Sequence, residues 1–496
     1  MLTGDAVAGT QLVRLLLPGI LPGYPQRIEL KCDLMKLTRQ NVWAHVDAAT
    51  NDELTWLFHF LVLPQKYNPF GKTEVFSAFD VYAKRFYAGL IPIVEQGARD
   101  AGIELNINDT RPSVNVQPVH LPWLRDYQLD VVADCLEKQI GIVDAPTGSG
   151  KTNIIVAVCA CLEGDVLIVV PRVDLLWQTK ERYESLLNER CGVWGDGAYE
   201  PQRVVVATFD TLYKGLAVKD GRTTKRLSKY SAVLVDEVHV VAGKKTMLVL
   251  RELVNARVRL GFSGTPLDRS DEQGLLTIGA TGPVIHKIHM ADLYAGGWLA
   301  KPTVHLVQQP IPTFRTGLPS WHDAESRVLG NKQRLFRIAK VAAGAPKPAI
   351  VFVRLLEHGL TVQEYLERFG MRTAFAEGKL NSTRRAELRT KLMNNELDVL
   401  VASVIFQVGV DMPALRSGVW AAGGKASIPV LQSLGRGMRK TTDKEEFDLY
   451  DMLDTPCELC ANVPVKKMHR VCKWFDDHRK KRLSIYRESG HDFVLE

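Results

Sequence analysis

The clearest indication of the fold is the stretch IGIVDAPTGSGKTNIIVAVCACL, residues 140–162. It begins with a short apolar run, turns at two glycines, and continues as a long apolar segment of the kind that forms a buried helix. A continuous apolar strand followed by a helix is typical of a parallel sheet that is covered on both faces. The stretch therefore predicts a strand, a tight loop and a helix in an α/β domain.

The loop itself, DAPTGSGKT at 144–152, fits the pattern (A/G)-x-x-x-x-G-K-(S/T), with Ala145 in place of the commoner first glycine. Its backbone N–H groups can surround phosphate oxygens at a helix N-terminus. Lys151 would reach the β- and γ-phosphates, and the Thr152 hydroxyl would bind Mg²⁺. The strand–loop–helix context disfavours the alternative, a turn that binds nothing. The expected nucleotide-binding residues are Pro146, Thr147, Gly148, Ser149, Gly150, Lys151 and Thr152.

A second motif supplies the carboxylates that phosphate hydrolysis needs. In AVLVDEVH, 232–239, four apolar strand residues precede Asp236 and Glu237. Asp236 would hold Mg²⁺ through water, and Glu237 would orient and deprotonate the attacking water. The alternative, a surface acidic pair at a strand end, is disfavoured by its place in a repeating strand–helix series. The sequence thus predicts catalytic roles for Lys151, Asp236 and Glu237, and Mg²⁺ binding by Thr152 and Asp236.

Short apolar runs recur along the chain in two series. The first covers 166–171, 203–209, 232–237 and 258–265, and the second covers 349–353, 373–377, 398–403 and 417–422. Between them, a proline-rich stretch of low periodicity is typical of a linker. We expect a separate N-terminal domain at 1–115, α/β domains at 116–300 and 331–455, a linker at 301–330, and a basic extension at 456–496.

Composition sets outer limits on function. Hydrophobic residues make up 46% of the 496 residues and charged residues 24%, as in ordinary globular proteins. The net charge of +7 permits a polyanionic partner without establishing one. No apolar run approaches the roughly 20 residues that span a bilayer, and the eight scattered cysteines suit a reducing compartment. We therefore expect a cytoplasmic protein with no membrane partner.

Several further stretches resemble, in order, the motifs of superfamily 2 helicases. They are LRDYQ (124–128), VPRVDLLWQ (170–178), ATFDTL (207–212), FSGTP (262–266), VASVIFQVGVDMP (401–413) and QSLGRGMRK (432–440). The resemblance covers roughly 120–455 and implies two tandem RecA-like parallel-sheet domains. It also implies that the N-terminal domain at 1–115 is a small α+β accessory DNA-binding domain and that the C-terminal extension is short.

The resemblance also implies roles for individual residues. Binding of the nucleotide would involve Arg125, Gln128, Gly409 and Asp411. Arginine fingers from the second domain would be Arg436 and Arg439, which would act as catalytic residues. Coupling of hydrolysis to movement would involve His239, Ser263, Thr265 and Gln432. Contacts to nucleic acid would come from Arg172, Thr208, Thr211, Arg354 and Ser403.

Within the superfamily, two stretches resemble the XPB-like, RecG-like and phage UvsW-like helicases. They are the region that follows FSGTP and the segment YAGGWLAKP (294–302). The N-terminal aromatic region and the tail are most similar to the phage UvsW group, and if the protein is phage-encoded its expected location is the host cell cytoplasm. His239 makes the box DEVH, of the DExH type, rather than DEAD. Ala145 for glycine and Ser403 for threonine are departures from the family pattern.

This resemblance implies an ATP-dependent DNA helicase or translocase that remodels branched DNA, such as forks, Holliday junctions and R-loops, in recombination, repair or replication. Its expected partners are branched or duplex DNA and recombination or replication proteins. Two alternatives remain open. One is an RNA helicase, and the other is a duplex-DNA translocase subunit of a nuclease or restriction complex.

The flanking regions carry less specific signals. Between 43 and 87 many aromatics lie near basic residues, a pattern that favours the core of a small domain and permits base stacking. Nine Lys or Arg residues against two acids between 464 and 487 suit either phosphate contacts or a solvated helix. In CELCANVPVKKMHRVC (457–472), Cys457 and Cys460 have zinc spacing, but His469 and Cys472 are not a common ligand pair. Zn²⁺ is thus an alternative, and packing of these side chains in a helix is favoured.

Overall fold

The computed structural model describes residues 34–63, 76–241, 243–267, 274–299, 302–313, 320–377, 380, 382–403, 412, 414–424, 446–488 and 492–496. Two compact units divide the chain. The first comprises the chain up to Asp144 and Thr152–Lys287, and the second comprises Ala145–Lys151 and Ile288–Glu496. Each unit is described by itself.

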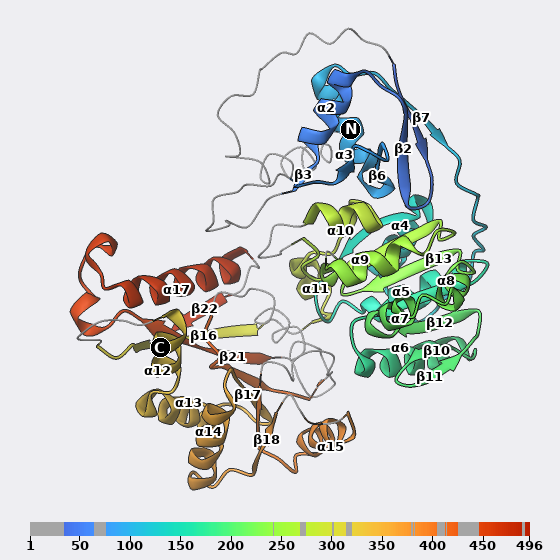
Figure 1. Ribbon diagram of the computed structural model, residues 1–496. Helices are drawn as coiled ribbons and strands as arrows, with labels where there is room; N and C mark the ends of the chain where they lie inside the picture. Colours follow the sequence, from blue (N-terminus) through green and yellow to red (C-terminus); the bar gives the residue numbers. More distant parts are fainter. Residues whose placement is uncertain are drawn as a thin grey trace. The chain divides into compact units, whose positions relative to one another are not determined.

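The larger part of the first unit is an eight-stranded sheet in the order β11-β10-β12-β9-β13-β14-β8-β15 (Figure 1). All neighbouring strands are parallel except the hairpin of β10 and β11. The strands are β8 (Ile140–Asp144), β9 (Val166–Val170), β10 (Gly192–Gly195), β11 (Ala198–Glu200), β12 (Val204–Thr208), β13 (Ala232–Asp236), β14 (Val258–Ser263) and β15 (Val284–Lys287). The helices are α4 (Asp126–Lys138), α5 (Lys151–Cys161), α6 (Val173–Leu187), α7 (Phe209–Ala217), α8 (Arg222–Leu227), α9 (Lys244–Arg251) and α10 (Gly274–Thr281).

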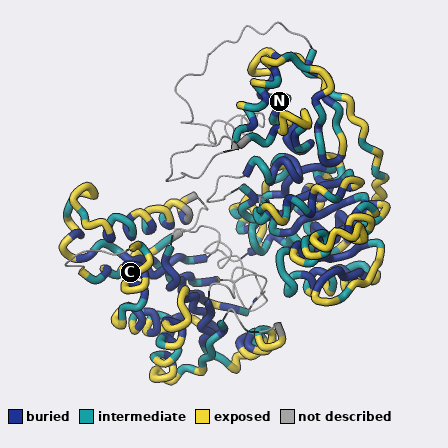
Figure 2. Tube along the Cα trace, in the orientation of Figure 1, coloured by how far each residue is buried: buried dark blue, intermediate teal, exposed yellow. Residues whose placement is uncertain are grey.

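The central strands of this sheet are covered on both faces. Every residue of β9, β12, β13 and β14 is buried, and Figure 2 shows these strands dark blue beneath helices whose outer sides are exposed. This burial explains why their sequences are continuously apolar rather than alternating. The expected α/β fold with a parallel sheet is confirmed in this unit.

The N-terminal part of the first unit is a small α+β structure. Its sheet has the order β5-β6-β2-β1-β7, with β1 and β7 parallel and the other pairs antiparallel. The elements are β1 (Met35–Arg39), β2 (Trp43–Ala48), α2 (Asn51–Phe60), β5 (Phe79–Asp80), β6 (Arg85–Tyr87), η1 (Ala88–Leu90), α3 (Ile91–Ala101), β7 (Leu105–Asp109) and a separate pair, β3 (Val62–Leu63) and β4 (Phe76–Ser77). A capping box starts α2, because the Thr50 hydroxyl accepts the Glu53 N–H and the Glu53 carboxylate accepts the Thr50 N–H.

This small sheet packs against the helices of the large one. A Cβ added to Gly89 would come within 2.3 Å of the Ile278 carbonyl in α10, so only glycine fits at this approach. The Asn41 amide donates a hydrogen bond to the Val254 carbonyl at 3.0 Å. Buried residues of both parts, including Phe86 and Ile278, belong to one hydrophobic cluster. The N-terminal part is therefore packed into the first unit rather than tethered to it.

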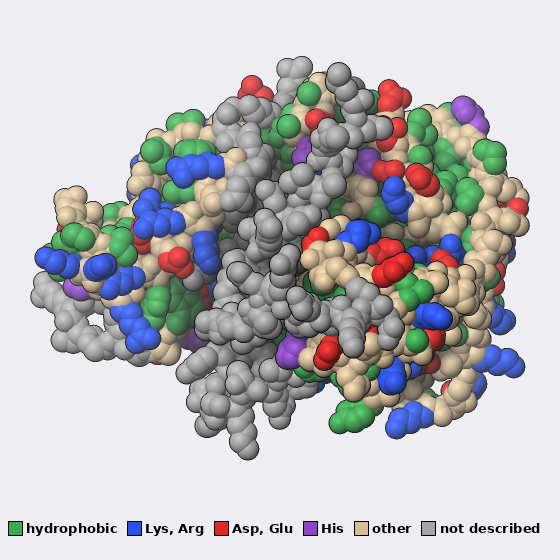
Figure 3. Space-filling model, turned by 90° about the horizontal axis from the view of Figure 1, so that it is seen from above, with side chains coloured by type: hydrophobic (Ala, Val, Ile, Leu, Met, Phe, Trp, Pro, Cys, Tyr) green, Lys and Arg blue, Asp and Glu red, His purple; other side chains and the backbone are tan. Residues whose placement is uncertain are grey.

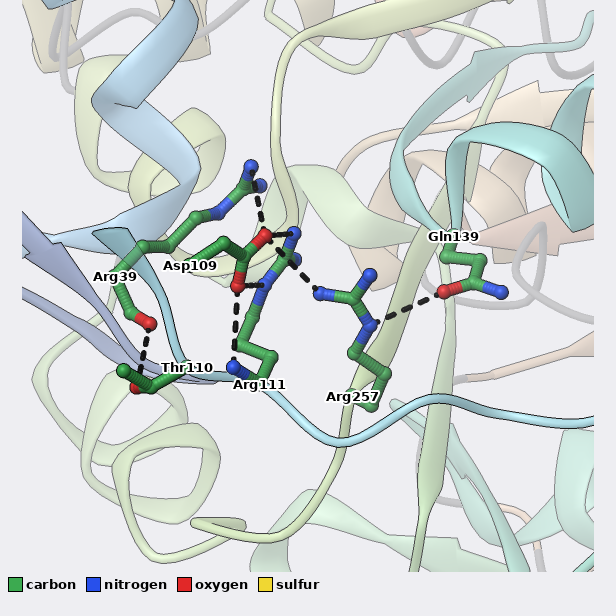
Figure 4. Close-up of polar contacts among 6 residues, drawn as sticks. All are labelled: Arg39, Asp109, Thr110, Arg111, Gln139 and Arg257. Carbon is green, nitrogen blue, oxygen red and sulfur yellow. Dashed lines mark hydrogen bonds and ion pairs between the residues drawn. The ribbon is translucent and has the colours of Figure 1, made fainter. Parts of the chain in front are cut away.

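A cluster of charged side chains joins the same two parts (Figure 4). Asp109, at the end of β7, accepts hydrogen bonds from Arg111 Nε at 2.7 Å and Nη2 at 2.5 Å. Its Oδ2 also lies 3.9 Å from Arg39 and 3.6 Å from Arg257. Arg257 precedes β14 and donates to Gln139 Oε1, just after α4. Three guanidinium groups thus share one carboxylate at the junction.

The second unit contains a seven-stranded, wholly parallel sheet in the order β18-β19-β17-β20-β21-β16-β22. Its strands are β16 (Pro302–Pro310), β17 (Ala349–Val353), β18 (Thr373–Ala376), β19 (Val399–Ser403), β20 (Ser417–Trp420), β21 (Phe447–Thr455) and β22 (Asp492–Leu495). Its helices are α11 (Met290–Ala295), α12 (Trp321–Leu329), α13 (Lys332–Gly344), α14 (Leu356–Arg368), α15 (Ser382–Met393) and α17 (Arg470–Glu488), with 3-10 turns η4 (Glu458–Cys460) and η5 (Val465–Lys467). The second parallel α/β sheet confirms the tandem arrangement expected from the sequence.

Part of the segment predicted to be a linker, 301–330, is instead regular structure. Residues 302–310 form β16, which pairs with β21 along its whole length, and 321–329 form α12. The prolines that made this strand difficult to recognise from the sequence, Pro302 and Pro310, lie at its two ends. There they remove few hydrogen bonds between strands. The linker prediction therefore needs correction over these residues.

The C-terminal extension also belongs to the second unit. β22 adds to the edge of the sheet beside β16, and α17 lies against β21. Arg482 in α17 forms a buried ion pair with Asp451 of β21 at 3.3 Å, and the Tyr486 hydroxyl donates to the same carboxylate at 2.9 Å. Over the part of the chain that the structure describes, no helix is long and apolar enough to cross a bilayer.

Candidate nucleotide and nucleic-acid site

The glycine-rich loop lies where the sequence predicts it, between β8 and α5. Gly148 and Gly150 have φ values of 91° and 80°, in the left-handed region that favours glycine. The Ser149 N–H donates to the Pro146 carbonyl at 3.2 Å, and Lys151 Nζ donates to the Ala145 carbonyl at 3.2 Å. The loop thus bends back on itself directly before an eleven-residue helix, as a phosphate-binding loop requires.

Strand register aligns three of the predicted motifs along one edge of the sheet. β14 lies between β13 and β8, with Asp236 opposite Phe262 and Ser263 opposite Asp144. Because the strands are parallel, their carboxyl ends meet at the same edge. The strand that leads into the loop, FSGTP and the acidic pair therefore end side by side. In open α/β sheets this edge is where ligands bind.

The acidic pair has an unusual backbone. Asp236 is buried, and its Oδ1 accepts the N–H of Glu237 at 3.0 Å. Glu237 has φ 53° and ψ 51°, a left-handed conformation that costs a non-glycine residue energy. Such strain persists where the surroundings hold it, and here it directs the Glu237 side chain to the following helical turn, η2 (Val238–Val240).

A network of polar contacts connects this box to FSGTP. His239 Nδ1 lies 2.9 Å from Ser263 Oγ and 3.3 Å from Glu237 Oε2. Ser263 Oγ is 3.5 Å from Glu237 Oε2 and accepts the Thr265 N–H at 3.2 Å. The structure therefore brings together Glu237 and three of the predicted coupling residues. The fourth, Gln432, lies outside the described residues.

Two of the residues predicted to bind the nucleotide, Arg125 and Gln128, lie at the start of α4. Arg125 is the N-cap residue, and its N–H donates to Gln128 Oε1 at 3.1 Å. Arg125 Nη1 lies 3.2 Å from the Tyr127 hydroxyl, while the Gln128 side chain is buried. In this structure Gln128 therefore helps to cap the helix.

The predicted nucleic-acid contacts of the first unit follow the next strand ends along the same edge. Arg172 is the N-cap residue of α6, just after β9. Thr208 ends β12 and caps α7, accepting the Thr211 N–H at 3.3 Å. β9 lies between β12 and β13, with Thr208 opposite Val170. The edge thus carries the phosphate-loop motifs on one side and these three residues on the other.

The second unit shows part of its predicted set. Ser403 ends β19 opposite Val353, and Arg354 follows Val353 at the end of the neighbouring strand β17. Arg354 Nη1 donates to Glu325 Oε1 in α12. Glu325 was missed by sequence reasoning because it lies in the segment interpreted as a linker. The remaining predicted residues of this unit, Gly409, Asp411, Arg436 and Arg439, lie outside the described residues.

Among the side chains that the structure describes in the N-terminal part, most aromatic ones pack in its core, as favoured from the sequence. Phe79 and Phe86 are buried, and Trp43 stacks on Tyr87 with ring centroids 4.6 Å apart. Tyr82 is the exception, since its side chain is fully exposed in the turn between β5 and β6.

The cysteine-rich segment is gathered into a cluster. Cys457, Cys460, His469 and Cys472 place one ligand atom each within 4.8 Å of all the others. The three cysteines are buried, and His469 is exposed. Cys457 and Cys472 come from different elements, the start of η4 and the first turn of α17, so the sequence alone could not place them together.

Comparison with known proteins is consistent with these motifs. Residues 122–268 match the family described as "Type III restriction enzyme, res subunit". The DNA 3'-5' translocase XPB2 of Sulfurisphaera tokodaii is 27% identical over 360 residues, which cover 65% of this chain and 80% of the relative. The ATP-dependent DNA helicase uvsW of Enterobacteria phage T4 is 24% identical over 390 residues, with 74% of this chain and 76% of the relative covered.

Among solved structures, the ATP-dependent Type ISP restriction-modification enzyme LlaBIII bound to DNA matches with a TM-score of 0.53 and 17% identity. The match covers 76% of this chain and 32% of that protein. This likeness is one of fold and confirms the tandem RecA-like domains. The chain has relatives among the XPB and UvsW proteins, which fits the resemblance of its ordered motifs to the superfamily 2 helicases.

Proposed function

We propose that the protein is an ATP-dependent DNA helicase or translocase of the DExH type that remodels branched DNA. The observation that carries the proposal is the contact network from Glu237 through His239 and Ser263 to Thr265. It joins a hydrolytic carboxylate to the loop after β14, beside the strand that leads into the glycine-rich loop. We assign the accessory domain to 1–115, the first motor domain to 116–287 and the second motor domain to 288–496, which includes β16, α12 and the C-terminal extension.

The residues present fit ATP and Mg²⁺. Left-handed glycines at 148 and 150 leave backbone N–H groups and the helix dipole of α5 available to phosphate oxygens. In our proposal Lys151 binds the terminal phosphates, and Thr152 and Asp236 hold Mg²⁺, directly and through water. When bound, the metal neutralises charge on the phosphate oxygens. Glu237 then orients water and accepts its proton.

Coupling follows from the position of His239. Its ring contacts both the Glu237 carboxylate and the Ser263 hydroxyl, so a displacement of Glu237 moves a hydrogen-bond partner of the FSGTP loop. Thr265 shares that hydroxyl through its backbone N–H. A change at the phosphates can therefore alter the loop without any long-range relay. Gln432, Arg436 and Arg439 complete this proposal as residues contributed by the second motor domain.

DNA is the proposed track. The relatives from Sulfurisphaera tokodaii and phage T4 are a DNA translocase and a DNA helicase by name, which supports DNA over RNA. Arg172, Thr208 and Thr211 follow adjacent strand ends, and in our proposal they contact the phosphate backbone with Arg354 and Ser403 of the second motor domain. The packed accessory domain, with Tyr82 exposed, offers a second surface for the arms of a junction.

A second candidate is translocation on duplex DNA without strand separation, as the motor of a restriction or nuclease complex. The match of 122–268 to the restriction res subunit family favours it. The two candidates share the ATP site and differ in what the motor does to the duplex.

Strand displacement separates these candidates. We expect ATP-dependent unwinding of a four-way DNA junction and a forked duplex to exceed that of a linear duplex and of a matched RNA duplex. Displacement of a third strand from triplex DNA without junction unwinding would favour the translocase. Unwinding of RNA alone would refute the DNA proposal. Lys151→Ala, which removes the phosphate-binding ammonium, is the matched blank in every reaction.

A further inference from the structure

The cysteine cluster of the second unit has the dimensions of a tetrahedral metal site. A zinc–sulfur bond is about 2.3 Å, so two thiolates on one tetrahedral zinc lie about 3.8 Å apart. Cys457 Sγ and Cys472 Sγ are 3.5 Å apart, and all four ligand atoms lie within 4.8 Å of one another. Only small side-chain shifts separate this arrangement from a coordinated ion.

The local backbone also suits bound thiolates. Cys457 is the N-cap residue of η4 and Cys460 is its last residue, and the N–H of His469 lies 3.3 Å from Cys460 Sγ. Amides directed at sulfur stabilise the negative charge that a metal-bound thiolate carries.

Nearby charge compensates the site. Three thiolates, a neutral imidazole and a divalent cation leave one net negative charge. Lys466, Lys467, Arg470 and Lys473 lie within or beside the same segment, and Figure 3 shows Lys and Arg side chains grouped over the end of this unit that holds α17. Beside a bound cation, basic residues that the sequence assigned to phosphate contacts or to a solvated helix would have a local role.

We propose that Cys457, Cys460, His469 and Cys472 bind one zinc ion as a closed structural site. Four protein ligands leave no open position for substrate, which is typical of structural rather than catalytic zinc. The ion would join η4, which follows β21, to the first turn of α17. The buried pair of Arg482 and Asp451 fixes α17 further along the helix, so the zinc would secure its other end.

Two alternatives make different predictions. A disulfide between Cys457 and Cys472 would need the sulfurs at about 2.05 Å and would leave Cys460 and His469 without a function. Packing alone would make the cluster equivalent to the other buried cysteines, Cys135, Cys159, Cys161 and Cys191. Among the described residues, the four proposed ligands are the group of His, Cys, Asp and Glu side chains gathered at metal-binding distances.

The test is metal analysis of the full-length chain, expressed in zinc-supplemented medium and purified without chelators. We expect one zinc per chain by elemental mass spectrometry and at least a tenfold loss in the double variant Cys457→Ser, Cys460→Ser. Cys191→Ser is the matched control, because it alters a buried cysteine outside the cluster, and it should keep the zinc. Chelation should lower the melting temperature of the wild type and leave that of the double variant unchanged.

A second measurement tests the proposal even if the double variant fails to fold. Wild-type protein stripped of zinc and titrated with Co²⁺ should show the visible absorption bands of tetrahedral cobalt thiolate, which His469→Ala should alter and His469→Cys should restore. The absence of these bands after zinc-stripped wild-type protein has been titrated with Co²⁺ would overturn the proposal. So would a Cys457–Cys472 disulfide found by mass spectrometry, or zinc retained in the double variant. None of these readouts depends on ATP hydrolysis.

Discussion

The arginine cluster at the junction of the accessory domain and the large sheet predicts the effect of one substitution in detail. Asp109→Ala removes the carboxylate that Arg39, Arg111 and Arg257 share, and leaves three guanidinium groups close together. The Arg111 side chain is only 5% exposed, while that of Asp109 is 39% exposed. The lost contacts are therefore neither fully buried nor fully screened by solvent.

The expected loss in the free energy of unfolding lies between two limits. A hydrogen bond to a charged group contributes about 1.5–3 kcal/mol, and an exposed ion pair contributes at most about 1 kcal/mol. Because Asp109 is more than a third exposed, we discount the upper limit and expect a loss of about 2 kcal/mol. For a unit of this size, that loss corresponds to a fall of roughly 5 °C in melting temperature.

The pKa of Asp109 gives the same substitution a pH signature. Burial opposes the shift, but the hydrogen bonds and charge of Arg111 lower the pKa to about 2, below the value of about 3.9 in an unfolded chain. The stabilisation is therefore complete above about pH 4 and is lost as the pH falls towards 2. The melting difference between wild type and Asp109→Ala should shrink over that window.

Differential scanning calorimetry at neutral and acidic pH measures both effects. Asp100→Ala is the control, since Asp100 is an exposed acid whose side chain accepts a hydrogen bond from Gln96, and it should melt with the wild type. An Asp109→Ala protein that melts within about 1 °C of the wild type at neutral pH would refute this reasoning.

Three other predictions test the site and the second unit. His239→Ala should keep ATP turnover within a few-fold of the wild type but lower strand displacement more than tenfold, because it cuts the contact between Glu237 and Ser263; equal losses in both assays would contradict a coupling role. Gly148→Ala forces a side chain into φ 91° and should weaken nucleotide binding roughly tenfold or more, from a strain of about 1–3 kcal/mol. Gly197→Ala, at φ 80° in open space, is its control and should not change affinity in fluorescent-nucleotide titrations. Asp454→Ala should destabilise the second unit by about 3–5 kcal/mol, because it leaves the buried Arg334 without its bidentate partner; Glu364→Ala, in an exposed pair with Arg368, should cost less than about 0.5 kcal/mol in the same melting assay.

Sequence reasoning succeeded where the local pattern and the tertiary environment agree. All eight apolar runs assigned to the two series overlap a strand, from β9 to β20, because burial on both faces requires continuous apolar sequence. The glycine-rich loop could be placed for the same reason, since a backbone with positive φ needs glycine at 148 and 150.

The features of the second unit that the sequence did not predict have a common physical cause, which is contact between segments that are apart in the sequence. β16 alternates between buried and partly exposed residues and is stabilised by β21 and β22, from more than 130 residues further along. The clustering of Cys457 with Cys472 likewise depends on a contact that spacing does not encode, whereas the capping contact of Arg125 with Gln128 is local, between residues three apart. The contact of Arg354 with Glu325 joins two segments that the sequence assigns to different parts.

The central claim, that this is an ATP-driven DNA motor, is tested most directly by steady-state ATP hydrolysis. Wild-type protein and Lys151→Ala would be compared without nucleic acid and with linear duplex DNA, single-stranded DNA, single-stranded RNA and a four-way DNA junction. The account predicts turnover in the wild type that DNA stimulates, the junction most of all, and no turnover in Lys151→Ala. Equal turnover in the two proteins, or stimulation by RNA alone, would contradict it.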